Sequence, residues 1–249
     1  MIEEEALKKL ARNNKLREKA HSVFMSMCDH KYSYHFSWLG RPIIQFPQDV
    51  LAVQEIVWKI KPDLIIETGI AHGGSLVLSA SLLALIDLTD KKSEINREDF
   101  IPRKVVGIDI DIRDHNKREI ENHPLKEWII LIEGSSTSTE VSKKVGKLAN
   151  NYKKILVMLD SNHTHDHVLR ELEIYSKLVS PGSYLIVFDT IIENMPASYF
   201  DNRPWDVGNN PMTAVKEFLK KNKNFIVDRH FDDKLIFSVA PQGYLKKIK

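Results

Sequence analysis

Cysteine is almost absent from this chain, which has Cys28 as its single example among 249 residues. One cysteine cannot form a disulfide within the chain, and a zinc site built on several cysteine thiolates is nearly excluded. The fold must therefore be held by an ordinary hydrophobic core, and a chain of this length is large enough to bury one within a single large domain.

Long apolar runs and an excess of charge of one sign are also missing. No apolar run reaches the roughly 18 residues of a membrane span, and the charged N-terminus lacks the apolar segment of a secretory signal. The 36 Lys and Arg residues nearly balance the 34 Asp and Glu residues, without a basic stripe interleaved with aromatic residues. These absences predict a cytoplasmic protein without a transmembrane segment or a nucleic-acid partner.

From residue 64 onward, short apolar runs alternate with segments of helical periodicity. We expect helices at 75–88, 114–122, 138–149, 165–178 and 211–221, and strands at 64–67, 104–109, 128–132, 154–159, 184–188, 225–228 and 234–239. Apolar strands separated by helices indicate a mostly parallel sheet covered on both faces. The last two strands, joined by a polar turn, predict an antiparallel hairpin. The expected fold class is therefore α/β, with a doubly wound, mostly parallel seven-stranded sheet of Rossmann-like type.

The first 62 residues do not follow this alternation. We expect a mixed-charge helix over 3–27, a helix ending at Ile60, and an irregular aromatic segment over 32–42, where Gly40 and Pro42 oppose regular structure. Residues 1–62 are predicted to form a helical and aromatic extension that acts as a lid or an oligomer contact, and residues 63–249 a ligand-binding domain. Residues 246–249 are expected to be a solvated tail.

The most informative stretch runs from Leu64 to Ser75, where an apolar strand ends in Glu67 and a glycine-containing turn follows. Glycine lets the backbone turn tightly and approach a ligand, because a Cβ would collide there. The spacing Glu-x-Gly-x-x-x-Gly differs from the dinucleotide fingerprint Gly-x-Gly-x-x-Gly. It looks like motif I of class I S-adenosylmethionine-dependent methyltransferases, although an ordinary strand–helix turn is the competing explanation.

Polar side chains end five successive strands of the expected sheet, and ligands of open α/β sheets bind beyond the carboxyl ends of the strands. Asp109 ends the second strand, where an acid accepts hydrogen bonds from ribose hydroxyls, and Asp111 competes for that role. Ser136 follows the third strand and either bonds the edge of an adenine ring or caps the next helix.

Asp160 and Asp189 end the fourth and fifth strands, which are neighbours in such sheets. Together they could hold Mg²⁺, which favours oxygen ligands, or each could cap a helix or bind a ligand. His163 is the candidate general base or substrate contact, because an imidazole titrates near neutral pH, and a rim histidine without a role is the alternative. His165 and His167 are expected to pack or to lie at the surface, so a catalytic zinc site is less favoured.

Two segments lie outside the strand–helix pattern and are rich in rings. Trp38 lies in the first, and Arg203 and Trp205 lie in the second, within the loop 190–210. Such residues suit a lid over a polar, ring-bearing acceptor such as a sugar, and they equally suit contacts in a homo-oligomer.

Taken together, these stretches resemble the cephalosporin hydroxylase family, a branch of the class I methyltransferases. The resemblance covers roughly residues 32–239, and its most specific pieces are FSWLG at 36–40, QFPQD at 45–49, ETGIAHGGS at 67–75, VGIDID at 106–111, LDSNH at 159–163 and NNP at 209–211. Despite the family's name, these motifs resemble those of methyltransferases. We find no facial triad of two histidines and a carboxylate that would argue for an iron oxygenase.

The resemblance implies an S-adenosylmethionine site and a magnesium site formed by Asp160 and Asp189. With the motif and strand-end residues added, the expected cofactor-binding residues are Glu67, Thr68, Gly69, His72, Gly73, Ser75, Asp109, Asp111, Ser136 and Asp160. The antibiotic-pathway enzyme after which the family is named has a Glu directly before the second metal-binding Asp, whereas Phe188 stands there in this chain.

We therefore expect a magnesium-assisted S-adenosylmethionine-dependent O-methyltransferase that acts on a hydroxyl of a small molecule or sugar, in a polysaccharide, glycolipid or natural-product pathway. Asp160 and His163 are the expected catalytic residues. The expected acceptor contacts are Trp38, His163, Arg203 and Trp205. The alternatives are an NAD or nucleotide-sugar oxidoreductase on a related sheet, and a non-catalytic binding protein.

Overall fold

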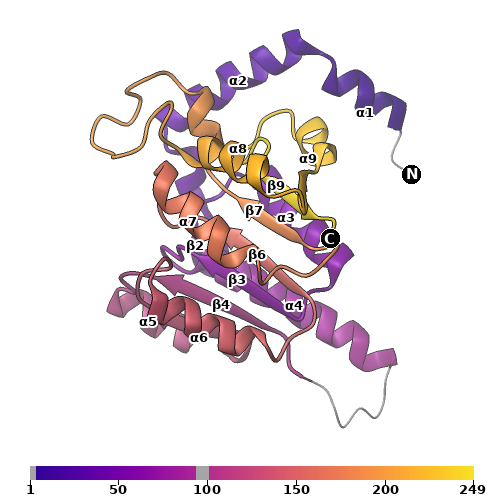
Figure 1. Cartoon of the computed structure of the whole chain (residues 1–249), viewed down its shortest axis with the longest axis vertical. Helices are drawn as coiled ribbons and strands as arrows, with labels where there is room; N and C mark the ends of the chain where they lie inside the picture. Colours follow the sequence, from indigo (N-terminus) through magenta and orange to yellow (C-terminus); the bar gives the residue numbers. More distant parts are fainter. Residues whose placement is uncertain (1–3, 94–100) are drawn as a thin grey trace.

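The computed structural model describes residues 4–93 and 101–249 (Figure 1). In this part of the chain a seven-stranded sheet has the order β5-β4-β3-β6-β7-β9-β8. Its strands are β3 Leu64–Thr68, β4 Lys104–Asp109, β5 Ile129–Glu133, β6 Ile155–Leu159, β7 Tyr184–Val187, β8 Phe225–Val227 and β9 Tyr244–Lys247. The pairings among β3 to β7 are parallel, and β9 runs antiparallel to both of its neighbours. The expected doubly wound, mostly parallel sheet is confirmed.

Two hydrophobic cores cover the two faces of the sheet, because its central strands are apolar on both sides. One core includes Phe24, Val57 and Leu76 from helices α2 Asn14–Asp29, α3 Pro47–Ile60 and α4 Gly74–Ser93. The other contains residues of α6 Thr139–Ala149, α7 His165–Tyr175 and α8 Pro211–Lys221, which lie in front of the sheet in Figure 1. Because the pairings among them are parallel, the strands β3, β4, β5, β6 and β7 all end at the same edge of the sheet.

The N-terminal region departs from the sequence expectation in two places. The single helix expected over 3–27 is broken into α1 Glu4–Ala11 and α2, whose first turn is capped by the side chain of Asn13. The segment expected to be irregular contains the short helix η1 Tyr32–His35 and a hairpin of β1 Phe36–Trp38 and β2 Arg41–Ile43. Leu39 and Gly40 both have positive φ, so the glycine that argued against regular structure forms the two-residue hairpin turn.

The C-terminal region contains the other error. The strand expected at 234–239 is wrong: α9 Arg229–Lys234 precedes it, and the last strand is β9. β8 and β9 do pair antiparallel, but a connection of sixteen residues, 228–243, replaces the expected short turn. The expected solvated tail is also wrong, since Lys247 pairs within the sheet and its Nζ donates to the carbonyl oxygens of Ser176 and Val179.

Residues on both sides of position 62 share one core. Phe46 and Ile56 belong to the same buried cluster as Ile65 and Tyr184. The division into a 1–62 extension that acts as a lid or an oligomer contact and a 63–249 ligand-binding domain stays a prediction.

The remaining elements are α5 Asp114–Glu121, η2 Lys126–Trp128 and η3 Thr190–Asn194. Within the described ranges, none of the helices combines the length and apolar character needed to cross a bilayer.

Candidate active site

The glycine turn after β3 adopts a conformation that brings backbone close to backbone. Gly69, Ala71 and Gly73 have positive φ, and a Cβ at Gly69 would collide with the carbonyl oxygen of Asp160. A Cβ at Gly73 would collide with the side chain of Ile120 on α5. The glycines in the motif are therefore required by the close approach of β6 and α5, which places the turn beside the end of β6.

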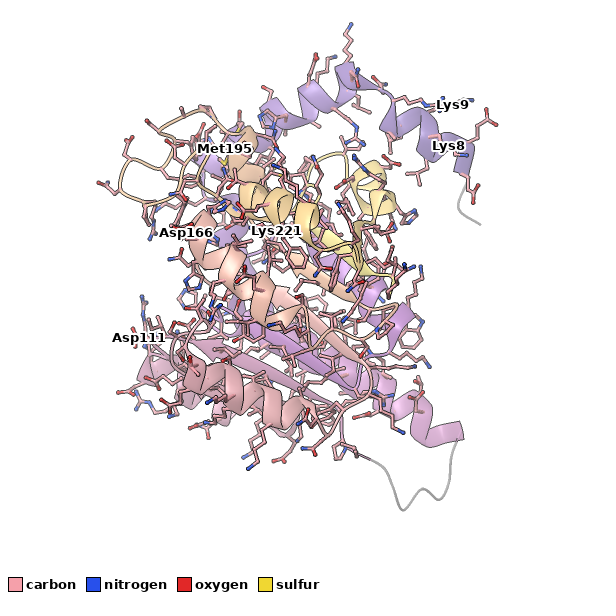
Figure 2. All side chains as sticks on the ribbon, in the orientation of Figure 1. Lys8, Lys9, Asp111, Asp166, Met195 and Lys221 are labelled. Atoms are coloured by element: carbon pink, nitrogen blue, oxygen red, sulfur yellow. The ribbon has the colours of Figure 1, made fainter. Side chains whose placement is uncertain are left out.

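Asp109 holds this turn from the end of β4. Its two carboxylate oxygens accept hydrogen bonds from the backbone N–H groups of Ile70, at 2.9 Å, and Asp111, at 3.2 Å. Asp109 remains half-buried, whereas Asp111 is exposed in the loop that leads to α5 (Figure 2). Of the two competitors for a ribose contact, Asp109 is the one that faces the turn.

A cavity of about 160 Å³ lies between this turn and the residues that follow β2. Its lining residues are Pro42, Ile43, Ile44, Gln45, Gly69, Ile70, Ala71, His72, Gly74, Ser75, Asp109, Asp160 and Ser161. Five residues expected to bind the cofactor thus share one cavity: Gly69, His72, Ser75, Asp109 and Asp160.

Glu67 lies beneath the cavity and is 2% exposed. Its Oε1 accepts a hydrogen bond from Ser75, whereas its Oε2 has no hydrogen-bond partner among the described residues. Burial raises the pKa of Glu67 to about 7, although the hydrogen bond from Ser75 opposes the shift. A second cavity of about 20 Å³, comparable to one water, joins Glu67 to Gln45 and Asp160.

Asp49 lines the far side of this small cavity and is fully buried on α3. Oδ1 accepts from Ser238 and Tyr244, and Oδ2 accepts from the backbone N–H of Val239. Burial raises the pKa of Asp49 to about 6, against the opposing effect of these hydrogen bonds. The segment 234–239 was expected to form a strand. Its hydrogen bonds to Asp49 hold it in an irregular path instead.

Asp160, His163 and Asp189 form the one candidate metal-binding group of at least three side chains found among the described residues. Their candidate ligand atoms all lie within 4.8 Å of one another. Nε2 of His163 lies 3.1 Å from Oδ2 of Asp189, and Nε2 of Gln45 donates to Oδ2 of Asp160 at 3.1 Å. Burial, followed by repulsion from Asp189 and Glu67, raises the pKa of Asp160 well above its ordinary value.

Such carboxylate and imidazole donors fit a divalent cation, which would relieve the repulsion between the two acids. Asp189 holds a left-handed conformation with φ of 54° at the end of β7. Phe188 is buried and lines the small cavity, so it offers no ligand atom where the named antibiotic-pathway enzyme has a carboxylate. His163 supplies the third candidate donor in this chain.

The loop between η3 and α8 brings two of the expected acceptor contacts beside His163. Trp205 meets the His163 ring edge-on, with the ring centroids 4.7 Å apart, and the exposed Arg203 lies over Trp205 at 5.2 Å. Glu193 and Asn210 tie this loop together through a 2.6 Å hydrogen bond. Trp38 is not brought to the site, because its Nε1 donates to Ser81 on α4.

Ser136 and Thr68 lie outside the larger cavity. Ser136 is buried, and its hydroxyl lies 3.2 Å from Nε2 of His167, in a cluster that includes Ser161 and Glu171. Thr68 is fully buried within the sheet. His165 packs between helices, where Nδ1 contacts Thr213. His165 and His167 each contact a neighbouring hydroxyl group, and their role as surface or packing residues stays a prediction.

The comparisons with known proteins agree with this fold. The model of the rhamnosyl O-methyltransferase/CmcI family matches residues 30–248. This chain belongs to that family. The seven-stranded class I methyltransferase fold of the rhamnosyl O-methyltransferase/CmcI family is confirmed, and so is the expected O-methyltransferase class. The curated relatives described below carry O-methyltransferase names rather than the hydroxylase label of the sequence resemblance.

Two relatives and two solved structures show the extent of the likeness. Rhamnosyl O-methyltransferase of Mycobacterium bovis (strain BCG / Pasteur 1173P2) is 28% identical over 200 residues, covering 79% of this chain and 72% of the relative. The Mycobacterium leprae (strain TN) protein of the same name is 29% identical over 161 residues, 64% of this chain and 62% of the relative.

Among solved structures, CmcI with Mg and SAM has a TM-score of 0.57 at 18% identity, over 87% of this chain and 78% of that one. An O-methyltransferase from Bacillus cereus in complex with SAH has a TM-score of 0.51 at 14% identity, over 85% and 81%. At such identities the two structures establish the shared fold.

Four residues near the site escaped the sequence interpretation: Gln45 and Asp49, described above, and Arg41 and Asn116, which donate hydrogen bonds to the carbonyl oxygens of His72 and Ala71 in the glycine turn. Gln45 and Asp49 lie within a stretch that carried the family resemblance, but neither ends a strand of the large sheet. Their contacts depend on long-range packing, so the motif that contains Gln45 and Asp49 did not indicate what either residue does.

Proposed function

We propose that this chain transfers a methyl group from S-adenosylmethionine to a hydroxyl of a sugar, with a rhamnosyl unit as the first acceptor to test. One observation carries the proposal: Asp160 lines the cavity of the glycine turn and also belongs to the Asp160–His163–Asp189 cluster. A cofactor site and a site for activating a hydroxyl therefore share a residue. The names of the mycobacterial relatives support the sugar acceptor.

The residues around the turn fit the proposed cofactor. Gly69 and Gly74 keep the cavity wall at backbone distance, and Asp109 offers a carboxylate for ribose hydroxyls. The unpartnered Oε2 of Glu67 is a buried acceptor that a cationic or hydrogen-bonding ligand group would satisfy. Gly69, His72, Ser75, Asp109 and Asp160 are the residues that we propose to hold S-adenosylmethionine, with Glu67 beneath them.

We propose that Asp160 and Asp189 hold Mg²⁺. When bound, such an ion orients the acceptor hydroxyl and lowers its pKa. Asp189 has a second task, because its Oδ2 lies 3.1 Å from Nε2 of His163 and holds the imidazole toward the acid pair. Gln45 orients Asp160 through its hydrogen bond to Oδ2.

His163 is proposed as the general base. As the acceptor oxygen forms its bond to the methyl carbon, the bond from that carbon to the sulfonium sulfur breaks and S-adenosylhomocysteine is left. The hydroxyl proton passes to the ring nitrogen of His163 that does not face Asp189. Trp205 restrains the imidazole ring by an edge-on contact, and its face offers a platform for the apolar side of a sugar ring. The guanidinium of Arg203 lies over the indole ring of Trp205, where it can donate hydrogen bonds to acceptor hydroxyls.

The test is calorimetry followed by a transfer assay. The protein should bind S-adenosylhomocysteine and should transfer labelled methyl groups from S-adenosylmethionine to rhamnose-containing glycosides, more slowly in EDTA. Absence of S-adenosylhomocysteine binding would overturn the proposal, and binding of NAD instead would favour the oxidoreductase alternative. Cofactor binding without transfer to any glycoside would favour the non-catalytic alternative.

Two further expectations belong to this proposal. We propose a cytoplasmic location, which suits the supply of S-adenosylmethionine, and a homo-oligomer without a nucleic-acid partner. Leu51 and Trp58 on α3 and Leu85 on α4 expose large apolar side chains, which an oligomer contact would bury. Light scattering of the purified chain tests the assembly.

A further inference from the structure

Strand β2 lies directly against the glycine turn, although the sequence suggested that it belongs to a separate extension. A Cβ at Gly74 would collide with the carbonyl oxygen of Pro42 and with Ile43. Pro42 and Ile43 also line the cavity beside the turn. The fit between β2 and the turn therefore sets the shape of one wall of the proposed cofactor site.

Arg41 on β2 grips the turn with a side chain that is almost completely buried. Its Nε and Nη2 both donate to the carbonyl oxygen of His72, at 3.1 and 2.7 Å. Nη2 also donates to Oδ1 of Asn116 at 2.8 Å, and Nη1 lies 3.6 Å from Glu119. A planar guanidinium can make these contacts together, whereas the compact ammonium of a lysine cannot reproduce their geometry.

Asn116 on α5 extends this grip to the preceding residue of the turn. Its Nδ2 donates to the carbonyl oxygen of Ala71 at 3.1 Å, while its Oδ1 accepts from Arg41. Arg41 and Asn116 thus hold two successive carbonyl groups. Ala71 has a φ of 45°, a left-handed conformation that a residue with a Cβ keeps only where its surroundings enforce it.

We propose that Arg41, acting through Asn116 and the carbonyl of His72, is a positioning residue that holds the glycine turn in its cofactor-binding shape. The proposal rests on the proposed function, since it assigns the cavity to S-adenosylmethionine. It makes the N-terminal hairpin part of the cofactor site rather than a lid. Arg41 acts on the affinity for the cofactor and leaves the acceptor side to Asp189, His163 and Trp205.

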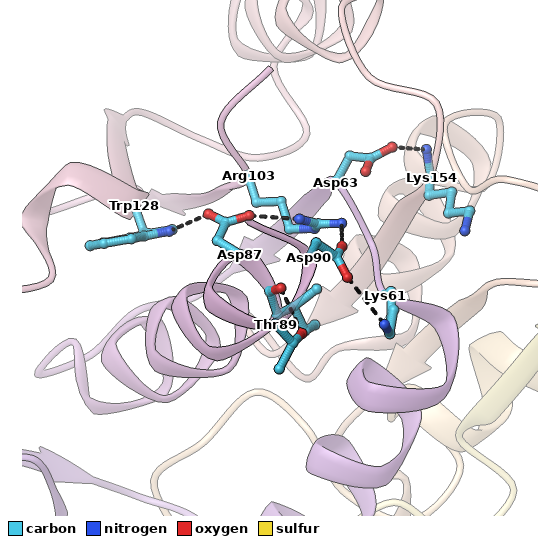
Figure 3. A network of polar contacts seen from close by, with 9 residues as sticks. Lys61, Asp63, Asp87, Thr89, Asp90, Arg103, Trp128 and Lys154 are labelled. Atoms are coloured by element: carbon cyan, nitrogen blue, oxygen red, sulfur yellow. Dashed lines mark hydrogen bonds and ion pairs between the residues drawn. The ribbon is translucent and has the colours of Figure 1, made fainter. Parts of the chain in front are cut away.

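The test compares Arg41→Lys with Arg103→Lys. Arg103 is buried to the same degree and is bonded to carboxylates, but it lies among Asp87, Asp90 and Trp128 at the opposite edge of the sheet (Figure 3). Calorimetry with S-adenosylhomocysteine should show a Kd about 10-fold higher for Arg41→Lys, from loss of hydrogen bonds to a charged donor. Arg103→Lys should lower the melting temperature without changing that Kd.

Two further readouts separate positioning from general destabilisation. For Arg41→Lys, the KM for S-adenosylmethionine should rise while kcat at saturating cofactor and the KM for the acceptor stay close to those of the unmodified protein. Amide hydrogen exchange over residues 69–75 should quicken in Arg41→Lys and in Asn116→Ala, and should stay unchanged in Arg103→Lys. The double variant Arg41→Lys/Asn116→Ala should lose little beyond either single change, because both act through one network.

The outcomes distinguish this inference from the proposed function. If the unmodified protein does not bind S-adenosylhomocysteine, the proposed function fails. If it binds, and folded Arg41→Lys has the same Kd and the same exchange over 69–75, the positioning role of Arg41 is overturned while the proposed function stands. Equal increases in Kd for Arg41→Lys and Arg103→Lys would also overturn it, because the effect would then come from lost stability.

Discussion

Buried acids have different neighbours at the two edges of the sheet, the amino edge where the parallel strands begin and the carboxyl edge where they end. At the amino ends of β3 and β4, Arg103 donates to Asp87 at 2.6 Å and to Asp90 at 2.7 Å, and Lys61 adds a bond to Asp90 (Figure 3). Burial alone would raise the pKa of Asp90, but the hydrogen bond from Lys61 and the charge of Arg103 lower it below its ordinary value. Acids at this edge are matched by cations.

At the carboxyl ends of β3, β6 and β7, acids face one another. Asp160 has Asp189 and Glu67 as its main charged neighbours, and its pKa is raised. Glu67 and Asp49 are buried with hydroxyl and amide donors rather than with cations. The comparison teaches that the amino edge pairs its acids in a way that favours stability. The carboxyl edge leaves acids together at a cost in stability, as expected for the ligand and cation site that we propose there.

Removing the guanidinium of Arg103 from the amino edge should have the largest effect on stability. Arg103→Ala leaves Asp87 buried and without its main cation, which should lower the free energy of unfolding by about 3–5 kcal/mol. Urea unfolding of the variant measures the loss, and the Kd for S-adenosylhomocysteine of the folded fraction should not change. A weakened Kd would show that the two edges are coupled.

Removing an acid from the carboxyl edge should affect turnover instead. Asp189→Ala removes one candidate metal ligand and the partner of His163, so methyl transfer should fall on the order of 10²-fold or more. Calorimetry should find S-adenosylhomocysteine binding nearly intact and Mg²⁺ binding lost. Asp166→Ala, an exposed acid at the start of α7, serves as the control (Figure 2). Full turnover in Asp189→Ala would contradict the assignment.

Neutralising Glu67 should reveal the stability cost of the carboxyl edge. The folded protein binds the Glu67 proton more tightly than the unfolded chain, because its pKa is raised from 4.5 to about 7. Its contribution to stability is therefore greatest below pH 4.5 and falls, by about 2–3 kcal/mol, as the pH rises to 7. Glu67→Gln should flatten this fall in urea unfolding and should weaken S-adenosylhomocysteine binding. Exposed Glu133→Gln is the control, and equal pH profiles for Glu67→Gln and the unmodified protein would reject the assignment.

The smallest predicted effect concerns the loop over the acid pair. Asn210 caps α8 with Thr213 and also donates to Glu193, so Asn210→Ala should cost about 1 kcal/mol and raise the KM for the acceptor. Ser138→Ala removes the cap of α6, which has no such loop attached. It should cause a similar loss of stability with the acceptor KM unchanged; matching KM values in the two variants would mean that the loop does not position the acceptor.

Local patterns were sufficient for much of the fold. Apolar runs located six of the seven strands of the sheet, because residues buried on both faces must be apolar. Pro211 and Asn210 located the start of α8, since a proline tolerates the first turn and an asparagine caps it. The segment 234–239 was wrongly predicted to be a strand because its apolar residues face the core. Its backbone donates a hydrogen bond to the side chain of Asp49 rather than to a neighbouring strand.

The features of the candidate site also fall into two groups, those that spacing along the chain predicts and those that only packing brings together. The amino-acid sequence by itself determined the alternating elements, the glycine turn and the acids at the strand ends, because each follows from spacing along the chain. Only the tertiary structure decided that Asp109 rather than Asp111 faces the turn, that His163 meets Asp189, and that the N-terminal hairpin contacts the glycine turn. These contacts join residues up to tens of positions apart, and their geometry is set by packing of strands and helices that no local pattern encodes.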